Sequence, residues 1–132
     1  GRMYKNVAEQ KSYVPYDPNL EDVVIFDIDG TLALMNGRSP FDWTRVGEDL
    51  PHEPVVRMFH KFVNDPNVFV YIVSGRDAAC RTETLNWLET YDILGFNWLY
   101  MRPEGDGRKD SIIKEEIYRN HWRKKNHAHV FS

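Results

Sequence analysis

An apolar run leads directly into two carboxylates and a glycine turn at Val23-Val24-Ile25-Phe26-Asp27-Ile28-Asp29-Gly30-Thr31. The β-branched and aromatic residues of the run predict a buried strand. Because ligands of open α/β sheets bind beyond the carboxyl ends of the strands, Asp27 and Asp29 are expected to face a crevice. Two carboxylates there suit a hard divalent cation, and one of them can attack phosphorus as a nucleophile. Asp and Gly are also ordinary turn residues, so the pattern alone leaves a plain turn as the alternative.

Strands and helices are expected to alternate along the rest of the chain. Apolar residues recur at strand or helix spacing, with Pro, Gly and Asn at the breaks. The expected helices span residues 54–63, 78–89 and 109–122, and the expected strands span 68–73, 97–101 and 128–131. Leu85 is expected on the inner face of the second helix, and either Ile112 or Tyr118 on that of the third. This alternation predicts an α/β layer fold with a parallel sheet. The turn residues of the segment 36–51 predict a hairpin or irregular flap over the strand ends.

Composition and charge are those of one globular domain. The 132 residues are 42% apolar and 28% charged, with a formal net charge of −3. This balance argues against broad electrostatic wrapping of nucleic acid, although it allows a local basic cleft. The single cysteine, Cys80, excludes an internal disulfide, and no run reaches the length of a membrane span. A cytoplasmic protein without a membrane partner is expected, in the host cytoplasm if a phage encodes it. Gly1-Arg2 before Met3 is interpreted as a cloning remnant in an N-terminal extension, residues 1–20.

A candidate anion site follows the strand at 68–73, at Ser74-Gly75-Arg76. These residues are expected where the strand ends and a helix begins, and backbone N–H groups at a helix start bind anions. The Ser74 hydroxyl adds a donor, and the Arg76 guanidinium is a planar fork that matches phosphate. A simple helix cap and turn would use the same residue types. The carboxylates one strand away favour the anion site.

A third candidate is the pair Asp110 and Lys114, which are four residues apart and therefore share one face of the helix at 109–122. Alone, the pair would be interpreted as an exposed salt bridge worth less than about 1 kcal/mol. Because it opens a helix after a glycine-containing loop, Lys114 can also lean over the same crevice. There it would neutralise phosphate oxygens and the attacking carboxylate, with Asp110 orienting it.

Together these blocks resemble the haloacid dehalogenase-like phosphohydrolases, and most closely the phosphatase domain of phage polynucleotide kinase/phosphatase. The resemblance covers roughly residues 23–132. It rests on the stretches Asp27-Ile28-Asp29-Gly30-Thr31-Leu32, Asn36-Gly37-Arg38-Ser39-Pro40-Phe41-Asp42, Val73-Ser74-Gly75-Arg76-Asp77 and 101–118. It implies an α/β fold with a three-layer Rossmann-like core, a parallel sheet, a small flap and no large cap domain.

The resemblance also implies a role for each residue of the site. Asp27 would be the nucleophile that forms an aspartyl-phosphate. Asp29 would be the general acid for the leaving alcohol and then the base for water. An Asp27 oxygen and the Asp29 backbone carbonyl would coordinate Mg²⁺, and Lys114 would bind phosphate oxygens. The substrate-binding residues would be Thr31, Ser74, Gly75 and Asp110 around the phosphate, with Arg38 and Arg76 near the phosphate or the adjoining nucleotide.

The expected function is that of a Mg²⁺-dependent polynucleotide 3′-phosphatase that heals DNA or RNA ends. A separate or fused kinase domain stays open as a partner. The chain itself has no G-x-x-x-x-G-K-[ST] loop. A small-molecule nucleotidase with the same core stays open as an alternative. So does a catalytically incomplete fragment that binds phosphate ends, because the family's fourth motif, an acidic pair after the last strand, has no counterpart before Phe131-Ser132. Residues 21–132 are therefore expected to be a phosphatase domain cut off before that motif, with two acidic residues within a few positions after Ser132.

Overall fold

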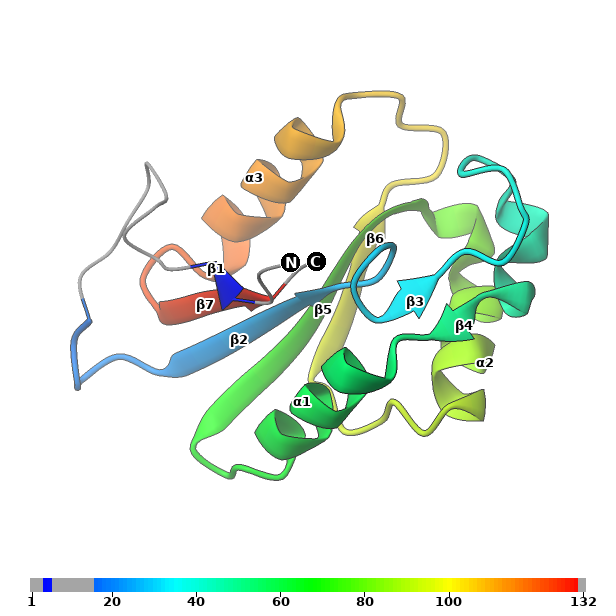
Figure 1. The fold of residues 1–132 in the computed structure, drawn as a ribbon. Helices are drawn as coiled ribbons and strands as arrows, with labels where there is room; N and C mark the ends of the chain where they lie inside the picture. The colour runs from blue at the N-terminus through cyan, green and yellow to red at the C-terminus, as the bar shows by residue number, and fades with distance from the viewer. Residues whose placement is uncertain (1–3, 6–15, 131–132) are drawn as a thin grey trace.

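The expected alternation of strands and helices is confirmed by the computed structural model, which describes residues 4–5 and 16–130 (Figure 1). The strands are β1 Tyr4–Lys5, β2 Asp22–Asp27, β3 Ala33–Leu34, β4 Leu50–Pro51, β5 Val68–Asp77, β6 Trp98–Arg102 and β7 Asn126–Val130. The α-helices are α1 Glu53–Val63, α2 Arg81–Thr90 and α3 Asp110–His121, and the 3₁₀ helices are η2 Trp43–Glu48 and η3 Ala78–Cys80.

The central sheet has the strand order β1-β7-β2-β5-β6. Its strands β7, β2, β5 and β6 are parallel, and β1 pairs antiparallel with β7. Asp27, the last residue of β2, lies opposite Val73 of β5. Because the two strands are parallel neighbours, their carboxyl ends meet at one edge of the sheet. This arrangement brings the residues after each strand into one place, as the sequence predicted.

Helices cover both faces of the sheet, which gives three layers (Figure 1). Strand β2 is apolar on both faces, as strands inside parallel sheets usually are. Val24 and Phe26 pack into one cluster with residues of α1 and α2. Val23 and Ile25 point the other way and pack with Tyr118 of α3. Burying each such side chain stabilises the fold by about 1.5–3 kcal/mol, so the core anchors the strand whose end carries Asp27.

A small flap leaves the sheet directly after β2. Gly30 has a φ of 77°, and its N–H donates to the Ala33 carbonyl at 2.9 Å as the chain turns. Strands β3 and β4 then pair antiparallel, and the residues between them include η2. The part of the chain that the structure describes contains no large cap domain. None of its helices is long and apolar enough to cross a membrane.

The strand β5 is longer than the sequence predicted. Ser74, Gly75 and Arg76 were expected between the end of this strand and a helix that begins near Ala78. Instead β5 continues through them to Asp77, η3 follows, and α2 begins only at Arg81. The register against β6 shifts between Ser74 and Asp77, so the strand is irregular there rather than finished. The helix-start argument for anion binding at these three residues is therefore wrong.

Two helix faces also differ in detail. On α2 the buried positions are Thr84, Trp87 and Leu88, so Leu85, expected to point inward, is 37% exposed. On α3 the two residues left open were Ile112 and Tyr118, and Tyr118 is the buried one. Residues 1–3, 6–15 and 131–132 lie outside the described residues, and so do most of the predicted N-terminal extension and the expected truncation after the last strand.

Candidate active site

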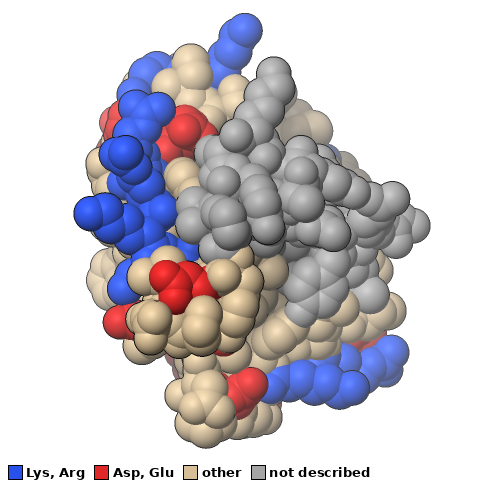
Figure 2. Space-filling view, turned by 90° about the vertical axis from the view of Figure 1, so that its left-hand side faces the viewer, with Lys and Arg blue, Asp and Glu red and all other residues tan. Residues whose placement is uncertain are grey.

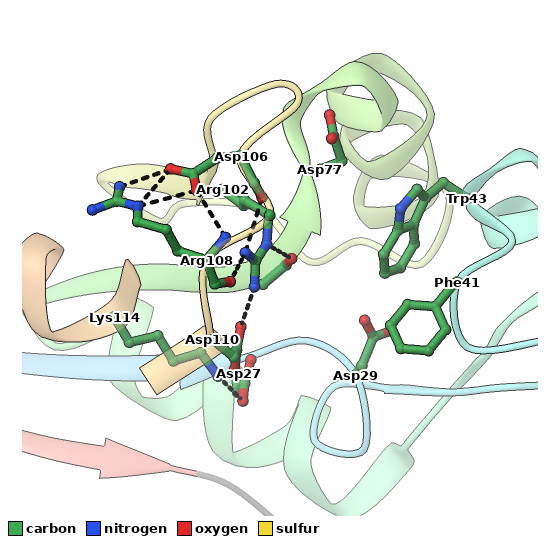
Figure 3. A pocket seen from close by; sticks show the side chains of 12 residues that line it. Asp27, Asp29, Phe41, Trp43, Asp77, Arg102, Asp106, Arg108, Asp110 and Lys114 are labelled. Atoms are coloured by element: carbon green, nitrogen blue, oxygen red, sulfur yellow. Dashed lines mark hydrogen bonds and ion pairs between the residues drawn. The ribbon is translucent and has the colours of Figure 1, made fainter. Parts of the chain in front are cut away.

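A cavity of about 490 Å³ opens at the carboxyl ends of β2, β5 and β6. The aromatic rings of Phe41 and Trp43 on the flap lie on one side, and the basic side chains of the β6–α3 region lie on the other (Figure 3). Asp27 lies low between the two sides. A cavity of this size is typical of small-molecule sites, so it has room for more than a phosphate group.

Two neighbours fix the carboxylate of Asp27. Its Oδ1 accepts a hydrogen bond from the Ile28 N–H at 2.9 Å, and its Oδ2 accepts one from Lys114 Nζ at 2.8 Å. Lys114 Nζ also lies 3.0 Å from Asp110 Oδ2, one helical turn away on α3. The fold therefore joins Asp27 to a lysine that is 87 residues further along the chain.

Burial and pairing act in opposite directions on this pair. Burial raises the pKa of Asp27 above its ordinary value, and the charge and hydrogen bond of Lys114 lower it by less. Burial would lower the pKa of Lys114, but the charge of Asp27 and the hydrogen bonds to Asp27 and Asp110 raise it overall. At Asp27 the effect of burial is larger than that of Lys114, so the pKa of the carboxyl is raised overall. Lys114 is held as a cation between the two carboxylates.

Asp29 is clamped by two buried arginines. Arg76 donates to both carboxylate oxygens, from Nη2 at 2.8 Å and from Nε at 3.2 Å, and Arg38 Nη2 donates to Oδ1 at 3.2 Å. The arginine side chains have no exposed surface, whereas the side chain of Asp29 is 32% exposed and lines the cavity. Two-point contact with a guanidinium fixes the plane of a carboxylate. Asp29 is therefore held in one orientation and is still open to the cavity.

Asp49 pairs with the same two arginines inside the protein. Its buried carboxylate accepts Arg38 at 2.8 and 3.0 Å and Arg76 at 2.9 Å. The hydrogen bond and charge of Asp49 raise the pKa of Arg38 further above its ordinary value. The Asp49 carbonyl also accepts the Trp87 indole N–H at 2.8 Å, which ties the end of the flap to α2. Two carboxylates thus share two guanidinium groups, and each buried charge has a partner.

The other predicted site residues fall into two groups. Ser74 and Thr31 are buried, and the Ser74 hydroxyl accepts the Arg76 N–H at 3.1 Å. Gly75 lines the cavity beneath Asp110, and a Cβ at this position would lie only 1.9 Å from Asp110 Oδ1. A side chain at this position would therefore displace the Asp110 carboxylate. Substrate contacts for these residues stay predictions.

Arg38 and Arg76 lie differently from what their predicted roles suggested. Both were expected near the phosphate or the adjoining nucleotide, but their guanidinium groups bind Asp29 and Asp49, and the cavity lining does not include them. Burying an unpaired guanidinium costs folding free energy, so carboxylates that are buried beside it accept its hydrogen bonds. Direct contact of either arginine with a substrate stays a prediction.

The oxygen donors of the site fit Mg²⁺. This ion is commonly held by one or two carboxylates and keeps several water ligands. Asp27 supplies a carboxylate, and the Asp29 backbone carbonyl is the second donor that the resemblance implies. Among residues 4–5 and 16–130, no group of three or more His, Cys, Asp or Glu side chains is placed to hold a metal ion. One carboxylate and one backbone carbonyl suit an ion that keeps much of its water shell.

Several residues of the site were not assigned from the sequence. Asp49 stands in an ordinary Glu-Asp-Leu-Pro turn, and no periodicity marks it as buried. Arg102 is the last residue of β6 and lines the cavity. It could have been found, because it follows the same rule that singled out Asp27, a polar residue at the carboxyl end of a parallel strand. Phe41 and Trp43 were seen only as flap residues.

Basic side chains lie in groups on the surface. On the face in Figure 2, Lys and Arg side chains gather along one edge and in a second group below, with Asp and Glu between them.

Comparisons with known proteins assign the chain to a family. Residues 21–131 match the sequence model described as the polynucleotide kinase PNKP phosphatase domain. A protein of Autographa californica nuclear polyhedrosis virus, described as a bifunctional polynucleotide kinase/RNA ligase, is 35% identical over 126 residues. That match covers 94% of this chain and 18% of the viral protein.

Two solved structures have a similar fold. A chain in the structure of the Pnkp1/Rnl/Hen1 RNA repair complex superimposes with a TM-score of 0.79 and 35% identity, covering 86% of this chain and 36% of that one. A second structure of the Pnkp1/Rnl/Hen1 complex gives a TM-score of 0.78 and 34% identity, covering 89% and 40%. The chain thus spans well under half the length of these relatives.

Proposed function

The chain belongs to the family of polynucleotide kinase PNKP phosphatase domains, and on that basis we propose that it removes the 3′-phosphate from nucleic-acid ends in a Mg²⁺-dependent reaction. The observation that carries the proposal is the 2.8 Å contact between Lys114 Nζ and Asp27 Oδ2 at the floor of the cavity. A carboxylate in contact with a fixed cation is suited to attack a phosphate group.

In the first step Asp27 attacks phosphorus, and the bond from phosphorus to the 3′ oxygen breaks. Asp29 donates its proton to that oxygen, so the nucleic acid leaves as an alcohol and Asp27 carries the phosphoryl group. The clamp of Arg38 and Arg76 holds Asp29 in one orientation at the cavity surface. Correct orientation of a catalytic group accounts for a large part of rate enhancement.

In the second step a water molecule attacks the phosphorus of the aspartyl-phosphate. Asp29 now takes the proton of that water, inorganic phosphate leaves, and Asp27 is regenerated. In both steps Lys114 stabilises charge on the transferring group. Asp27 and the Asp29 carbonyl would hold Mg²⁺, which supplies further positive charge to the phosphate oxygens when bound.

The test is hydrolysis of a 3′-phosphorylated oligonucleotide by the chain, with Mg²⁺ and with the metal chelated. RNA is the first substrate to try, because one solved relative is part of the Pnkp1/Rnl/Hen1 RNA repair complex. The 3′-phosphate of the substrate is radiolabelled. Two results support the proposal: turnover that requires Mg²⁺, and label that stays on the protein after an acid quench. Turnover without a labelled protein, in an experiment sensitive enough to detect one, contradicts the covalent route.

A free 3′-mononucleotide separates this function from that of a small-molecule nucleotidase. A polynucleotide phosphatase is expected to act on the oligonucleotide with the higher kcat/KM. Equal or better turnover of the mononucleotide supports the nucleotidase.

A kinase partner is proposed from the relatives alone. The viral relative is described as a polynucleotide kinase/RNA ligase, and this chain covers only 18% of it. We therefore propose that a kinase activity accompanies this domain, on the same chain or on a partner. Phosphorylation of 5′-hydroxyl ends by the parent protein is the corresponding assay.

A further inference from the structure

Arg102 is held rigidly at the cavity by backbone carbonyl groups. Its Nε donates to the Gly75 carbonyl at 2.9 Å, and its Nη1 donates to the carbonyls of Asp106, at 3.0 Å, and Arg108. Its Nη2 has a carboxylate contact with Asp110 Oδ1, at 3.4 Å. Neutral acceptors therefore hold the guanidinium, while the one carboxylate contact of the group is long.

The other cations of the cavity are neutralised more fully. Arg108 is bonded to Asp106 at 2.7 Å and to Glu116 at 2.8 Å, and these carboxylates raise its pKa. Lys114 lies between Asp27 and Asp110, at 2.8 and 3.0 Å. Arg102 is consequently the cation of the cavity with the least compensated charge. Its side chain is 15% exposed, so the charge can reach a ligand.

We propose that Arg102 binds a second anionic group of the substrate, the phosphodiester on the 5′ side of the terminal nucleoside. The inference rests on the proposed function, because it assumes that the terminal phosphate lies at Asp27 and Lys114. It gives the site a means to distinguish the end of a polynucleotide from a free mononucleotide.

The position of Arg102 fits the phosphodiester better than it fits the terminal phosphate. Asp110 stands between Arg102 and Lys114, so the contacts run in the order Asp27, Lys114, Asp110 and Arg102 (Figure 3). The terminal phosphate has its own cation in Lys114. The cavity of about 490 Å³ extends past both groups and has room for a nucleotide unit.

Its bonding also prepares Arg102 to act as a donor. A guanidinium has five N–H groups, and three of them are used by the carbonyls. The remaining nitrogen, Nη2, carries the other two N–H groups, and its one contact, with Asp110 Oδ1, is long. A side chain that is already ordered loses little entropy when it binds, so its contact with a phosphate is more favourable.

The experiment compares three substrates of the chain: a nucleoside 3′-monophosphate, the corresponding nucleoside 3′,5′-bisphosphate, and a 3′-phosphorylated dinucleotide. The wild-type chain is expected to have a KM for the bisphosphate and the dinucleotide about tenfold or more below that for the monophosphate, the effect of one charge-assisted hydrogen bond. Arg102→Gln keeps an N–H donor for the loop carbonyls and removes the charge. This variant should lose the preference, so that its own KM values for the three substrates agree within about twofold.

Arg108→Gln is the matched control, because Arg108 lines the same cavity but is already paired with two carboxylates. It should retain the preference. A dinucleotide with a neutral methylphosphonate linkage tests the same contact without any substitution in the protein. Its KM for the wild-type chain should rise to that of the monophosphate.

Three results would overturn the inference. The first is a preference that survives in Arg102→Gln. The second is an equal loss of kcat/KM on all three substrates in this variant, which would mean that Arg102 only positions the loop. The third is a wild-type chain that does not distinguish charged from neutral linkages. In each case hydrolysis of the 3′-phosphorylated dinucleotide still tests the proposed function separately. A wild-type chain that hydrolyses none of the substrates contradicts the proposed function itself.

Discussion

Arg76 Nη2 lies 2.9 Å from Asp49 Oδ2, and neither side chain has any exposed surface. The same nitrogen lies 2.8 Å from Asp29 Oδ1, whose side chain is open to the cavity. One guanidinium thus connects a carboxylate inside the protein with the carboxylate proposed as general acid and base. Asp49 never meets the cavity, yet it helps to determine where Asp29 points.

Asp49→Asn is expected to destabilise the protein by about 3–5 kcal/mol, because removing one partner leaves buried guanidinium charge uncompensated. Urea unfolding measures this difference. Asp92→Asn is the control, since Asp92 is exposed and has a φ of 57°, which asparagine tolerates well. The control should change stability by less than about 0.5 kcal/mol. Equal effects of the two substitutions would mean that the buried network does not stabilise the fold.

Asp27→Asn should abolish phosphatase activity and leave the fold intact, because a neutral amide does not attack phosphorus. Activity is measured on the 3′-phosphorylated oligonucleotide and the fold by circular dichroism. The substitution also removes the ion pair with Lys114, so a modest change in melting temperature is compatible with the proposal. Turnover at a tenth of the wild-type rate or better would refute Asp27 as the nucleophile.

Lys114→Ala should lower kcat by about a hundredfold or more, because it removes a charge aimed at the transferring phosphoryl group. The loss of a surface ion pair would change stability by less than about 1 kcal/mol and leave kcat unchanged. Lys61→Ala on α1 is the matched control, since Lys61 is exposed and lies outside the cavity lining. If Lys114→Ala stays within a few-fold of wild type while its melting temperature falls, Lys114 is structural.

Gly75→Ala tests the close contact between β5 and α3. The new Cβ would lie 1.9 Å from Asp110 Oδ1, so Asp110 must move, and Lys114 loses the partner that holds it. A displacement of about 1 Å in a catalytic group can lower the rate by up to about a hundredfold. Gly47→Ala should be harmless, since no atom lies within 4 Å of its new Cβ. Full activity in Gly75→Ala would show that the position of Asp110 does not matter for catalysis.

The loop before α3 should respond to acid through Asp106. The hydrogen bonds from the Arg108 side chain and backbone lower the pKa of Asp106 from 3.8 to about 2. Because the folded pKa is lower than the unfolded one, this contact stabilises the fold above pH 3.8 and the contribution is lost as pH falls towards 2. A carboxyl carbon NMR titration measures the pKa directly. Arg108→Met should move it back towards 3.8, and an unchanged titration would show that Arg108 is not the cause.

The arrangement of the elements followed from local patterns in the sequence. The run from Val23 to Phe26 predicted β2, and the apolar spacing of the later segments predicted the helices and strands of the layers. The convergence of Asp27 with the polar end of β5 also followed, because parallel strands end at one edge of a sheet. Asp110 and Lys114 were predicted to share a helix face, and they lie 3.0 Å apart.

What the tertiary structure decided is which charged groups pair inside the protein. The sequence predicted Arg38 and Arg76 as cations near the phosphate, but it contained no sign that Asp49 would be buried between them. Arg76 reaches Asp29 across 47 residues of chain, and no local spacing encodes such a contact. The physical reason is desolvation: a charge removed from water requires an opposite charge at hydrogen-bond distance, and packing of the whole fold determines which group is there. Local periodicity determines strands, helices and the edge where the site forms, whereas burial determines which of its charges remain free to meet a substrate.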